Sequence, residues 1–405
     1  MTRHRRGSTI RSDAAAVAAA SALLAAGAAP QIISGPLAPY LRLDLGISSS
    51  ELGLGLSLSA VPAVVLAVWL GRVTDRVGGI NVGRLTCIGG CFFVVALSQA
   101  PSTAWFVALL AAAGILRVLS EPSSSRILVD FLARTPRVLA FGIREAAMPL
   151  LVLVSTAVLP VFGDRLGWRT VFAACSVFAL TGLALLMGPA RPRKQSVPVG
   201  VRSGPAAPVT AGPPRNARDD VASLGLGFLG GAALLFINLV VFNAFASLSF
   251  VDAGASADTA AALVAASAGG SVLMRIGCAH AVTRRDLDAP RTTAAMAAVA
   301  VAGYAAMATG STALMFVGIP VGYVAGWGWT PLLFAHITVG RERSTGMITG
   351  IVSTMFAVAA LVSPVAAGWA AENLGWLAVW ALVALFSALA AALMWHRPTG
   401  NSKAD

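Results

Sequence analysis

The sequence predicts an all-α membrane protein with twelve transmembrane helices, arranged as two six-helix bundles of similar size. Of the 405 residues, 57% are hydrophobic and only 11% are charged, which is too little charge to cover a water-soluble domain. The apolar residues fall into runs of about 20, the length that a helix needs to cross a bilayer. A polar stretch near the middle of the chain divides these runs into two sets of six.

The apolar runs and the polar breaks between them give the limits of the expected spans. They lie at 14–39, 52–71, 82–99, 103–125, 138–162, 170–189, 222–250, 258–280, 292–310, 312–338, 345–371 and 376–395. Ser48 and Glu51 have the spacing of a capping box before the second span. Prolines within spans remove helical hydrogen bonds and allow bending, and they stand at Pro62, Pro149, Pro331 and Pro364.

The domain organisation follows from the same pattern. We expect an N-terminal tail at 1–13, an N-terminal bundle at 14–189, a linker at 190–221, a C-terminal bundle at 222–395 and a C-terminal tail at 396–405. The linker is rich in proline, glycine, alanine and arginine and has few large apolar residues. This composition is typical of a flexible connection.

The basic residues indicate the orientation of the spans. A net charge of +12 alone would suggest a nucleic-acid partner, but the lysines and arginines are spread between apolar runs. With the N-terminus in the cytoplasm, 24 of the 29 lysines and arginines fall on cytoplasmic segments, and only Arg42, Arg165 and Arg169 fall in outside loops. Because such a bias sets topology, we expect both termini, both tails and the linker in the cytoplasm, and no nucleic-acid partner.

The two halves carry signs of an internal repeat. Leu-Gly-Trp opens the sixth span at 166–168 and the twelfth at 374–376, which is 208 positions later. Gly71 ends the second span, and Gly277 stands near the end of the eighth, 206 positions later. Two matches at nearly one offset favour a duplicated six-helix unit.

The segment 71–79 resembles the loop motif G-x-x-x-D-R-x-G-R-[RK] of the major facilitator superfamily, and the resemblance to this superfamily extends over nearly the whole chain. The matching residues are Gly71, Asp75, Arg76 and Gly78. The resemblance implies a cytoplasmic gating motif that latches the outward-open state without touching the substrate. We expect Gly71 to permit close helix approach, and Asp75 and Arg76 to pair with helix ends and charges.

A second resemblance concerns the fifth span. Residues 142–150 are similar to a G-I-[KR]-[QE]-x-G-x-P-L stretch of bacterial members near cyanate and nitrate transporters, with Ala147 in place of a glycine. The Gly-Pro-Gly-Gly signature of drug/proton antiporters is missing from this span, which argues modestly against drug efflux. The resemblance implies a multi-pass protein of the bacterial inner membrane.

Ionisable residues within spans are costly, at about 2.5–3.5 kcal/mol each on insertion scales. Arg117 and Glu121 are four apart and share one face of the fourth span. They form either a mutually neutralising structural pair or a functional one, in which Arg117 binds an anion or couples transport and Glu121 carries a proton. Adjacent Arg144 and Glu145 point about 100° apart, so we expect that they cannot both face one cavity, and Arg144 could instead snorkel to the cytoplasm.

The resemblance implies that the first, fourth, seventh and tenth spans line a central cavity. The predicted substrate-binding residues are Arg117, Arg144, Gln31, Asn238, Asn243, Tyr323 and Trp327, and the predicted proton-coupling residues are Glu121 and Arg117. The alternatives are interhelical hydrogen bonding for the asparagines and interface anchoring for the aromatic residues. Arg275 stands near the cytoplasmic end of the eighth span and is a weaker candidate.

These observations predict a secondary active transporter that moves a small organic solute by alternating access and is driven by protons. Arginines within the first-half spans favour an anion. A drug or metabolite efflux antiporter and a non-transporting membrane sensor or scaffold are the alternatives. We find no Walker loop, catalytic triad or metal-ligand cluster in the sequence, so we expect no enzyme activity and no cofactor. The expected partners are a small-molecule substrate, protons and the lipid bilayer, and we expect a monomer.

Overall fold

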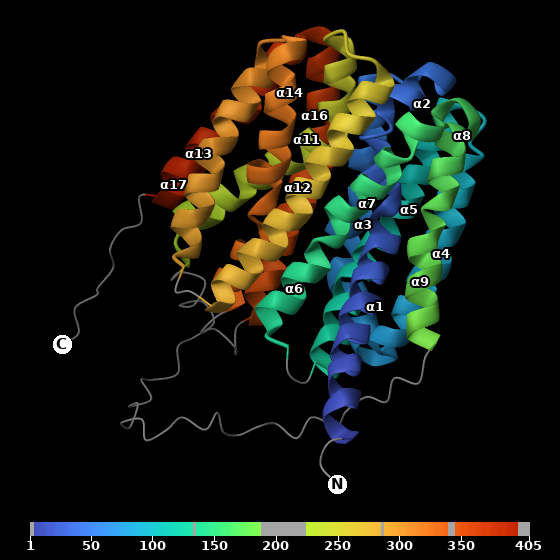
Figure 1. Cartoon of the computed structure of the whole chain (residues 1–405), viewed down its shortest axis with the longest axis vertical. Coiled ribbons are helices and arrows are strands. Elements are labelled where there is room, and N and C mark those ends of the chain that lie inside the picture. The colour runs from blue at the N-terminus through green and yellow to red at the C-terminus, as the bar shows by residue number, and fades with distance from the viewer. Residues whose placement is uncertain (1–3, 133–134, 188–223, 285–286, 339–344, 396–405) are drawn as a thin grey trace, which may run out of the picture.

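The computed structural model describes residues 4–132, 135–187, 224–284, 287–338 and 345–395. All regular structure in these residues is helical (Figure 1). The N-terminal half contains α1 (His4–Ser34), α2 (Ala38–Leu45), α3 (Ser49–Val77), α4 (Gly79–Ser98), α5 (Thr103–Phe131), α6 (Arg137–Glu145), α7 (Ala147–Ala157), α8 (Leu159–Ala174) and α9 (Ser176–Met187). The C-terminal half contains α11 (Leu226–Asp252), α12 (Ala257–Arg284), α13 (Ala289–Ala308), α14 (Thr312–Val321), the π-helix η1 (Gly322–Gly326), α15 (Thr330–Thr338), α16 (Thr345–Asn373) and α17 (Trp376–Trp395).

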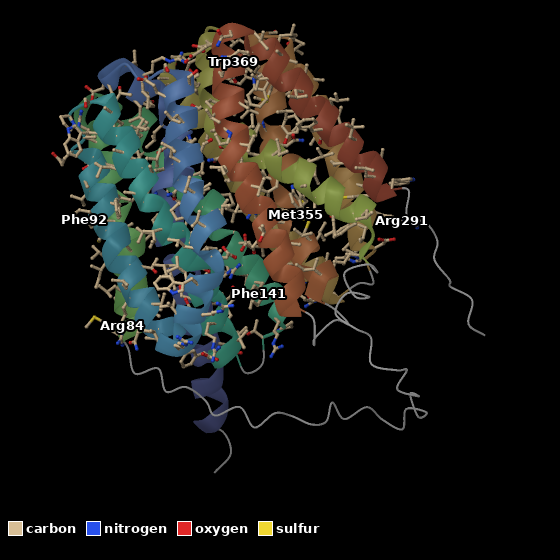
Figure 2. All side chains as sticks on the ribbon, turned by 180° about the vertical axis from the view of Figure 1, so that it is seen from behind. Arg84, Phe92, Phe141, Arg291, Met355 and Trp369 are labelled. Atoms are coloured by element: carbon tan, nitrogen blue, oxygen red, sulfur yellow. The ribbon has the colours of Figure 1, made fainter. Side chains whose placement is uncertain are left out.

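Eleven stretches of the described chain are long and apolar enough to cross a membrane. The remaining expected span corresponds to α13, which has 20 residues and carries Arg291 and two threonines in its first turns. Large apolar side chains cover the outer surface, as Figure 2 shows for Phe92 and Trp369, which are 61% and 56% exposed. Outward apolar side chains at this density are typical of a lipid-facing surface. The predicted all-α membrane fold is confirmed.

The helices of the two halves lie side by side, and α1 begins at the same end of the molecule at which α17 ends (Figure 1). The loops and helix ends on this side carry many arginines, so we name it the basic end. Its described arginines include Arg76, Arg84, Arg137, Arg284 and Arg291. The other side, where α2 lies, is named the opposite end.

Polar contacts join the two halves at the opposite end. The N-terminal half supplies the donors and the C-terminal half the carboxylates: Arg42 donates to Asp252 at 2.6 Å, Tyr40 to Asp258 at 2.6 Å, and the Ser50 amide to Glu372 at 2.8 Å. Burial and the hydrogen bond to Asp258 raise the pKa of Tyr40, so its phenol remains a donor at physiological pH. The opposite end is therefore closed in this structure.

Small residues let the halves approach closely at the same end. A Cβ added at Gly35 would clash with the backbone of Asn243 and Ala244 on α11. Likewise, a Cβ at Gly53 of α3 would clash with the Pro364 carbonyl of α16. These contacts are between backbones, which cannot move aside as a flexible side chain could.

Gly35→Val is expected to prevent closure of the opposite end, because overpacking at a backbone contact costs about 1–3 kcal/mol. The open form should then gain at least about fivefold in population. Faster hydrogen–deuterium exchange in peptides covering 38–50 would report this change. Gly230→Val is the matched control, since a Cβ at Gly230 meets only the end of the Leu393 side chain, at 3.8 Å. Equal exchange in both variants would contradict the prediction.

Four of the predicted spans are interrupted in the structure: the sixth at Cys175 between α8 and α9, the tenth between η1 and α15, and the first and fifth as follows. The first was expected over 14–39, but α1 ends at Ser34 and α2 begins at Ala38, because Gly35 and Pro36 interrupt the helical hydrogen bonds. The fifth was expected over 138–162; the structure has one apolar stretch there, Arg137–Ala157, with a one-residue interruption at Ala146 between α6 and α7. The capping box before α3 is confirmed, with both of its hydrogen bonds formed.

Candidate functional site

Five ionisable side chains from α5, α6 and α12 lie together between the halves. Arg144 Nη2 lies 2.7 Å from Glu121 Oε1 and 2.6 Å from Glu145 Oε1. Arg117 Nη1 approaches Glu121 Oε2 at 3.8 Å, and Arg275 Nη1 approaches Glu145 Oε2 at 3.8 Å. We name this set the charge network. With every group ionised, three arginines and two glutamates give it a net charge of +1.

Arg144 is the most enclosed member of the charge network. Its side chain is 1% exposed, and its guanidinium also donates to Ser125 Oγ at 2.5 Å and to Ser124 Oγ at 3.3 Å, both on α5. The same guanidinium lies 4.9 Å from the ring centre of Phe141, which Figure 2 places between the halves toward the basic end. These partners fix the position of the charge and offset much of its desolvation cost.

The charge network has an accessible edge, formed by α5. The side chains of Arg117 and Glu121 are 37% and 34% exposed, whereas Glu145 and Arg275 are 10% and 2% exposed. Within the described chain, the other hydrogen-bond contact of Arg117 is the Met148 sulfur, at 3.9 Å. Arg117 and Glu121 are therefore more accessible than Glu145 and Arg275.

The arrangement of these charges differs in three ways from what the sequence suggested. Arg144 and Glu145 were expected to point apart, but they form an ion pair, because both side chains are long enough to turn toward each other from neighbouring positions of α6. Snorkelling of Arg144 is excluded by its burial. Glu121 also has its closest partner in Arg144 rather than in Arg117.

The predicted polar contacts divide into two groups. Both amide atoms of Gln31 on α1 are buried without a hydrogen-bond partner among the described residues, which leaves them able to bind a ligand. The Asn243 amide nitrogen donates to the Ile32 carbonyl at 3.2 Å and so joins the two halves. Asn238 instead donates to the Val383 carbonyl of α17 at 3.0 Å, the interhelical bond that was its alternative interpretation.

The two predicted aromatic contacts lie at the irregular part of the α14–α15 segment. Tyr323 belongs to η1, and Trp327 follows it directly. Their rings are 5.4 Å apart in an edge-on arrangement, and each side chain is only 1% exposed. Burial excludes the alternative of interface anchoring. The Trp327 indole nitrogen has no hydrogen-bond partner in the described part of the chain, and π-helical turns are frequent at functional sites.

Glu145 and Arg275 were not among the predicted site residues, although both belong to the charge network. Arg275 was expected near the end of its span, but its side chain is 2% exposed and lies 5.1 Å from the Trp327 ring centre. The sequence signal that could have identified Arg275 is its position within an apolar run. Its partners come from two other helices, so their identity depends on how the halves dock.

The predicted gating motif forms a turn at the basic end. Gly78 has φ +90° and separates α3 from α4, a backbone conformation that favours glycine. Arg76 is exposed, with no hydrogen bond or ion pair to any described residue, and the side chain of Asp75 lies outside the described residues. The close approach expected at Gly71 is wrong for this conformation, since a Cβ there would meet nothing within 4 Å.

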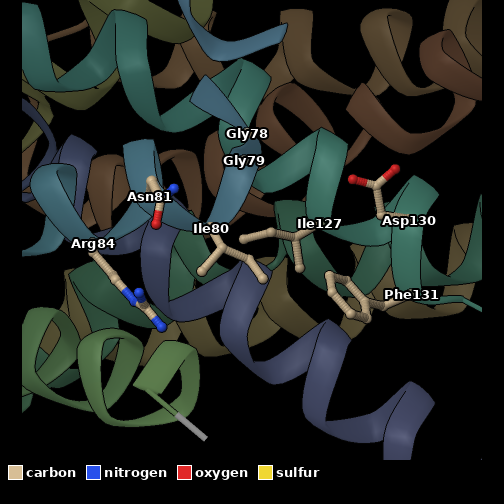
Figure 3. A pocket seen from close by; sticks show the side chains of 8 residues that line it. All are labelled: Gly78, Gly79, Ile80, Asn81, Arg84, Ile127, Asp130 and Phe131. Carbon is tan, nitrogen blue, oxygen red and sulfur yellow. The ribbon is translucent and has the colours of Figure 1, made fainter. Parts of the chain in front are cut away.

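A hollow of about 370 Å³ lies beside this turn (Figure 3). It is lined by Gly78, Gly79, Ile80, Asn81, Arg84, Ile127, Asp130 and Phe131. Arg84 donates to the Leu186 carbonyl at 2.9 Å, and Asp130 pairs with Arg126 at 3.0 Å. The charged groups of this hollow thus have partners of their own and do not belong to the charge network.

Comparison with known proteins identifies the family to which this architecture belongs. The family model of the Major Facilitator Superfamily matches residues 17–338. The chain belongs to this superfamily. Over 171 residues it is 29% identical to the uncharacterized MFS-type transporter YqjV of Bacillus subtilis (strain 168). That match covers 40% of this chain and 42% of the relative.

Solved structures of the superfamily share the fold along almost the whole chain. A bacterial homologue of the human lysosomal transporter Spinster has a TM-score of 0.68 at 15% identity, covering 98% of this chain and 97% of its own. A D-xylose-proton symporter gives 0.65 at 16% identity, with 95% and 97% covered. The nucleoside transporter NupG gives 0.66 at 13% identity, with 94% and 98% covered. These likenesses show the fold, and the match to the family model shows that the chain is a multi-pass membrane protein of the superfamily.

Proposed function

We propose that this transporter moves a small organic anion by alternating access and couples its movement to protons. The observation that carries the proposal is the charge network, which has a net charge of +1 and an accessible edge at Arg117 and Glu121. A buried excess of positive charge is unfavourable unless an anion compensates it. A bound anion would provide that compensation.

Arg117 is the residue best placed to receive the anion. Its contact with Glu121 is long, at 3.8 Å, so most of its donors are available. A guanidinium presents donors in a planar fork that matches a carboxylate or a phosphate. The Gln31 amide and the Trp327 indole, which have no partner among the described residues, are further donors for the same solute.

Glu121 links the anion to the proton in this proposal. Its carboxylate bonds to Arg144 and also approaches Arg117. Protonation of Glu121 raises the net charge of the network from +1 to +2, which favours anion binding. A proton and an anion would therefore bind together, as symport requires.

We further propose that the basic end faces the cytoplasm. Its arginines satisfy the positive-inside rule, which places the closed opposite end outside the cell. The conformation is then closed to the outside. The Spinster homologue of similar fold was solved in an inward-facing and occupied conformation, which agrees with this assignment.

Arg117→Gln is expected to reduce anion uptake at least about tenfold, because one charged hydrogen-bonding partner of the solute is lost. Purified protein in liposomes with an imposed pH gradient would be supplied with radiolabelled carboxylates, sulfonates and organic phosphates, and separately with lipophilic cations. The control is Arg291→Gln, which removes an arginine that is exposed at the basic end and pairs locally with Asp288. Unchanged uptake by Arg117→Gln would contradict the proposal, and transport of the lipophilic cations alone would favour the efflux antiporter.

A further inference from the structure

Arg275 of α12 connects two helices through their backbones rather than through side chains alone. Its Nη1 donates to the Glu145 carbonyl at 2.7 Å, and its Nε and Nη2 donate to the Trp327 carbonyl at 3.2 and 2.9 Å. Glu145 belongs to the N-terminal half, whereas Trp327 and Arg275 belong to the C-terminal half. One buried guanidinium thus spans the boundary between the halves.

Prolines explain why these two carbonyls can accept a hydrogen bond. In an α-helix the carbonyl of residue i bonds to the amide of residue i+4, and proline has no amide hydrogen. Pro149 stands four residues after Glu145, and Pro331 stands four residues after Trp327. Each proline therefore frees the carbonyl to which Arg275 donates, and each stands in the first turn of the helix that follows an interruption, α7 for Pro149 and α15 for Pro331.

The bond to Glu145 depends on the relative position of the two halves. At 2.7 Å it is short, and a hydrogen bond weakens steeply when its geometry changes by an ångström or so. Alternating access displaces the halves relative to each other. The bond can therefore form only in some of the relative positions that the halves adopt. The structure in which it forms is also closed at the opposite end through Tyr40 and Arg42.

We propose that Arg275 is a positioning residue that stabilises the conformation closed at the opposite end, by bonding the carbonyl freed by Pro149 in the other half. The inference rests on the alternating-access part of the proposed function. Its connection to the charge network is Glu145, whose carboxylate bonds to Arg144 while its carbonyl bonds to Arg275. Glu145 thus contacts both the charge network, through its carboxylate, and the opposite half of the protein, through its carbonyl.

The test uses hydrogen–deuterium exchange on the purified full-length protein without any solute. Arg275→Gln is expected to speed exchange about tenfold in peptides at the opposite end, covering 38–50 and 252–258, because a charged hydrogen bond across the boundary is lost. Exchange in α4, which lies within the N-terminal half, should remain unchanged. A uniform rise across all peptides would instead indicate a general loss of stability and overturn the proposal.

Pro149→Ala provides an independent variant that leaves Arg275 in place. It supplies an amide at position 149 that bonds the Glu145 carbonyl within its own helix and so competes with Arg275. We expect the same selective rise in exchange at the opposite end. The matched control is Pro62→Ala, which restores a helical bond in α3, where no described arginine donates to the freed carbonyl of Leu58.

If Pro149→Ala behaves like Pro62→Ala, the proposal is wrong, whether or not Arg275→Gln can be purified. Failure of the proposed function gives a different result, because exchange is measured without substrate. Absence of anion uptake combined with a selective rise in exchange would reject the transport assignment and retain the role of Arg275. Anion uptake combined with unchanged exchange in both variants would retain the transport assignment and reject the role of Arg275.

Discussion

Glu121→Gln is expected to abolish proton-coupled anion uptake while the protein remains folded. The amide keeps the shape of the side chain and can still accept a hydrogen bond from Arg144, which now lies 2.7 Å from Glu121 Oε1. The variant cannot change its charge, so binding of the anion no longer depends on a proton at this position. Since Glu121 is 34% exposed, loss of its charge is tolerated better than the loss of a fully buried one.

Uptake into liposomes at several external pH values would measure this effect, together with counterflow of the anion in the absence of a pH gradient. We expect gradient-driven uptake to fall at least about a hundredfold and counterflow to persist, because exchange of the anion needs no net proton movement. Asp130→Asn is the control, since this carboxylate lies at the basic end and pairs with Arg126. Normal gradient-driven uptake by Glu121→Gln would remove this residue from the coupling mechanism.

The membrane-spanning helices could be predicted from the sequence because their signal is local. About 20 apolar residues cross a bilayer whatever surrounds them, and α17 begins and ends where hydropathy places it, at Trp376 and Trp395. The helix α2 was missed because Gly35 and Pro36 interrupt an apolar run without changing its hydropathy. Similarly, α6 and α7 were merged because the run continues through Ala146.

The charge network could be predicted only in part, for a reason that is also physical. Arg117 and Glu121 share one helix face, so their spacing indicated a pair. The strongest bond of Glu121, however, is made to Arg144 on another helix, and the bonds of Arg275 cross between the halves. Such contacts depend on tertiary docking, which the periodicity of a single sequence does not encode. The positions of Pro149 and Pro331 did mark the free carbonyls, but they did not identify the donor.

Arg144→Met is expected to destabilise the protein more than any of the other substitutions. The side chain is 1% exposed, and its removal leaves Glu145 buried, with Arg275 as its remaining cation in the charge network at 3.8 Å. Breaking a buried ion pair by removing one partner costs about 3–5 kcal/mol, because the remaining charge is uncompensated. The midpoint of thermal unfolding of the purified protein in detergent should therefore fall further for Arg144→Met than for any of the other substitutions.

A second substitution separates this electrostatic cause from a loss of packing. If the stranded carboxylate is responsible, Arg144→Met/Glu145→Gln should be more stable than Arg144→Met alone, although it carries one more change. Replacing both partners of a buried pair is often close to neutral, whereas replacing one is not. Arg126→Met is the control for removing a paired arginine at the surface, where about 0–1 kcal/mol is expected. If the double variant is less stable than Arg144→Met, the arginine acts mainly through its contacts with Ser124, Ser125 and Phe141, and the positive charge of the network is then not what organises the site.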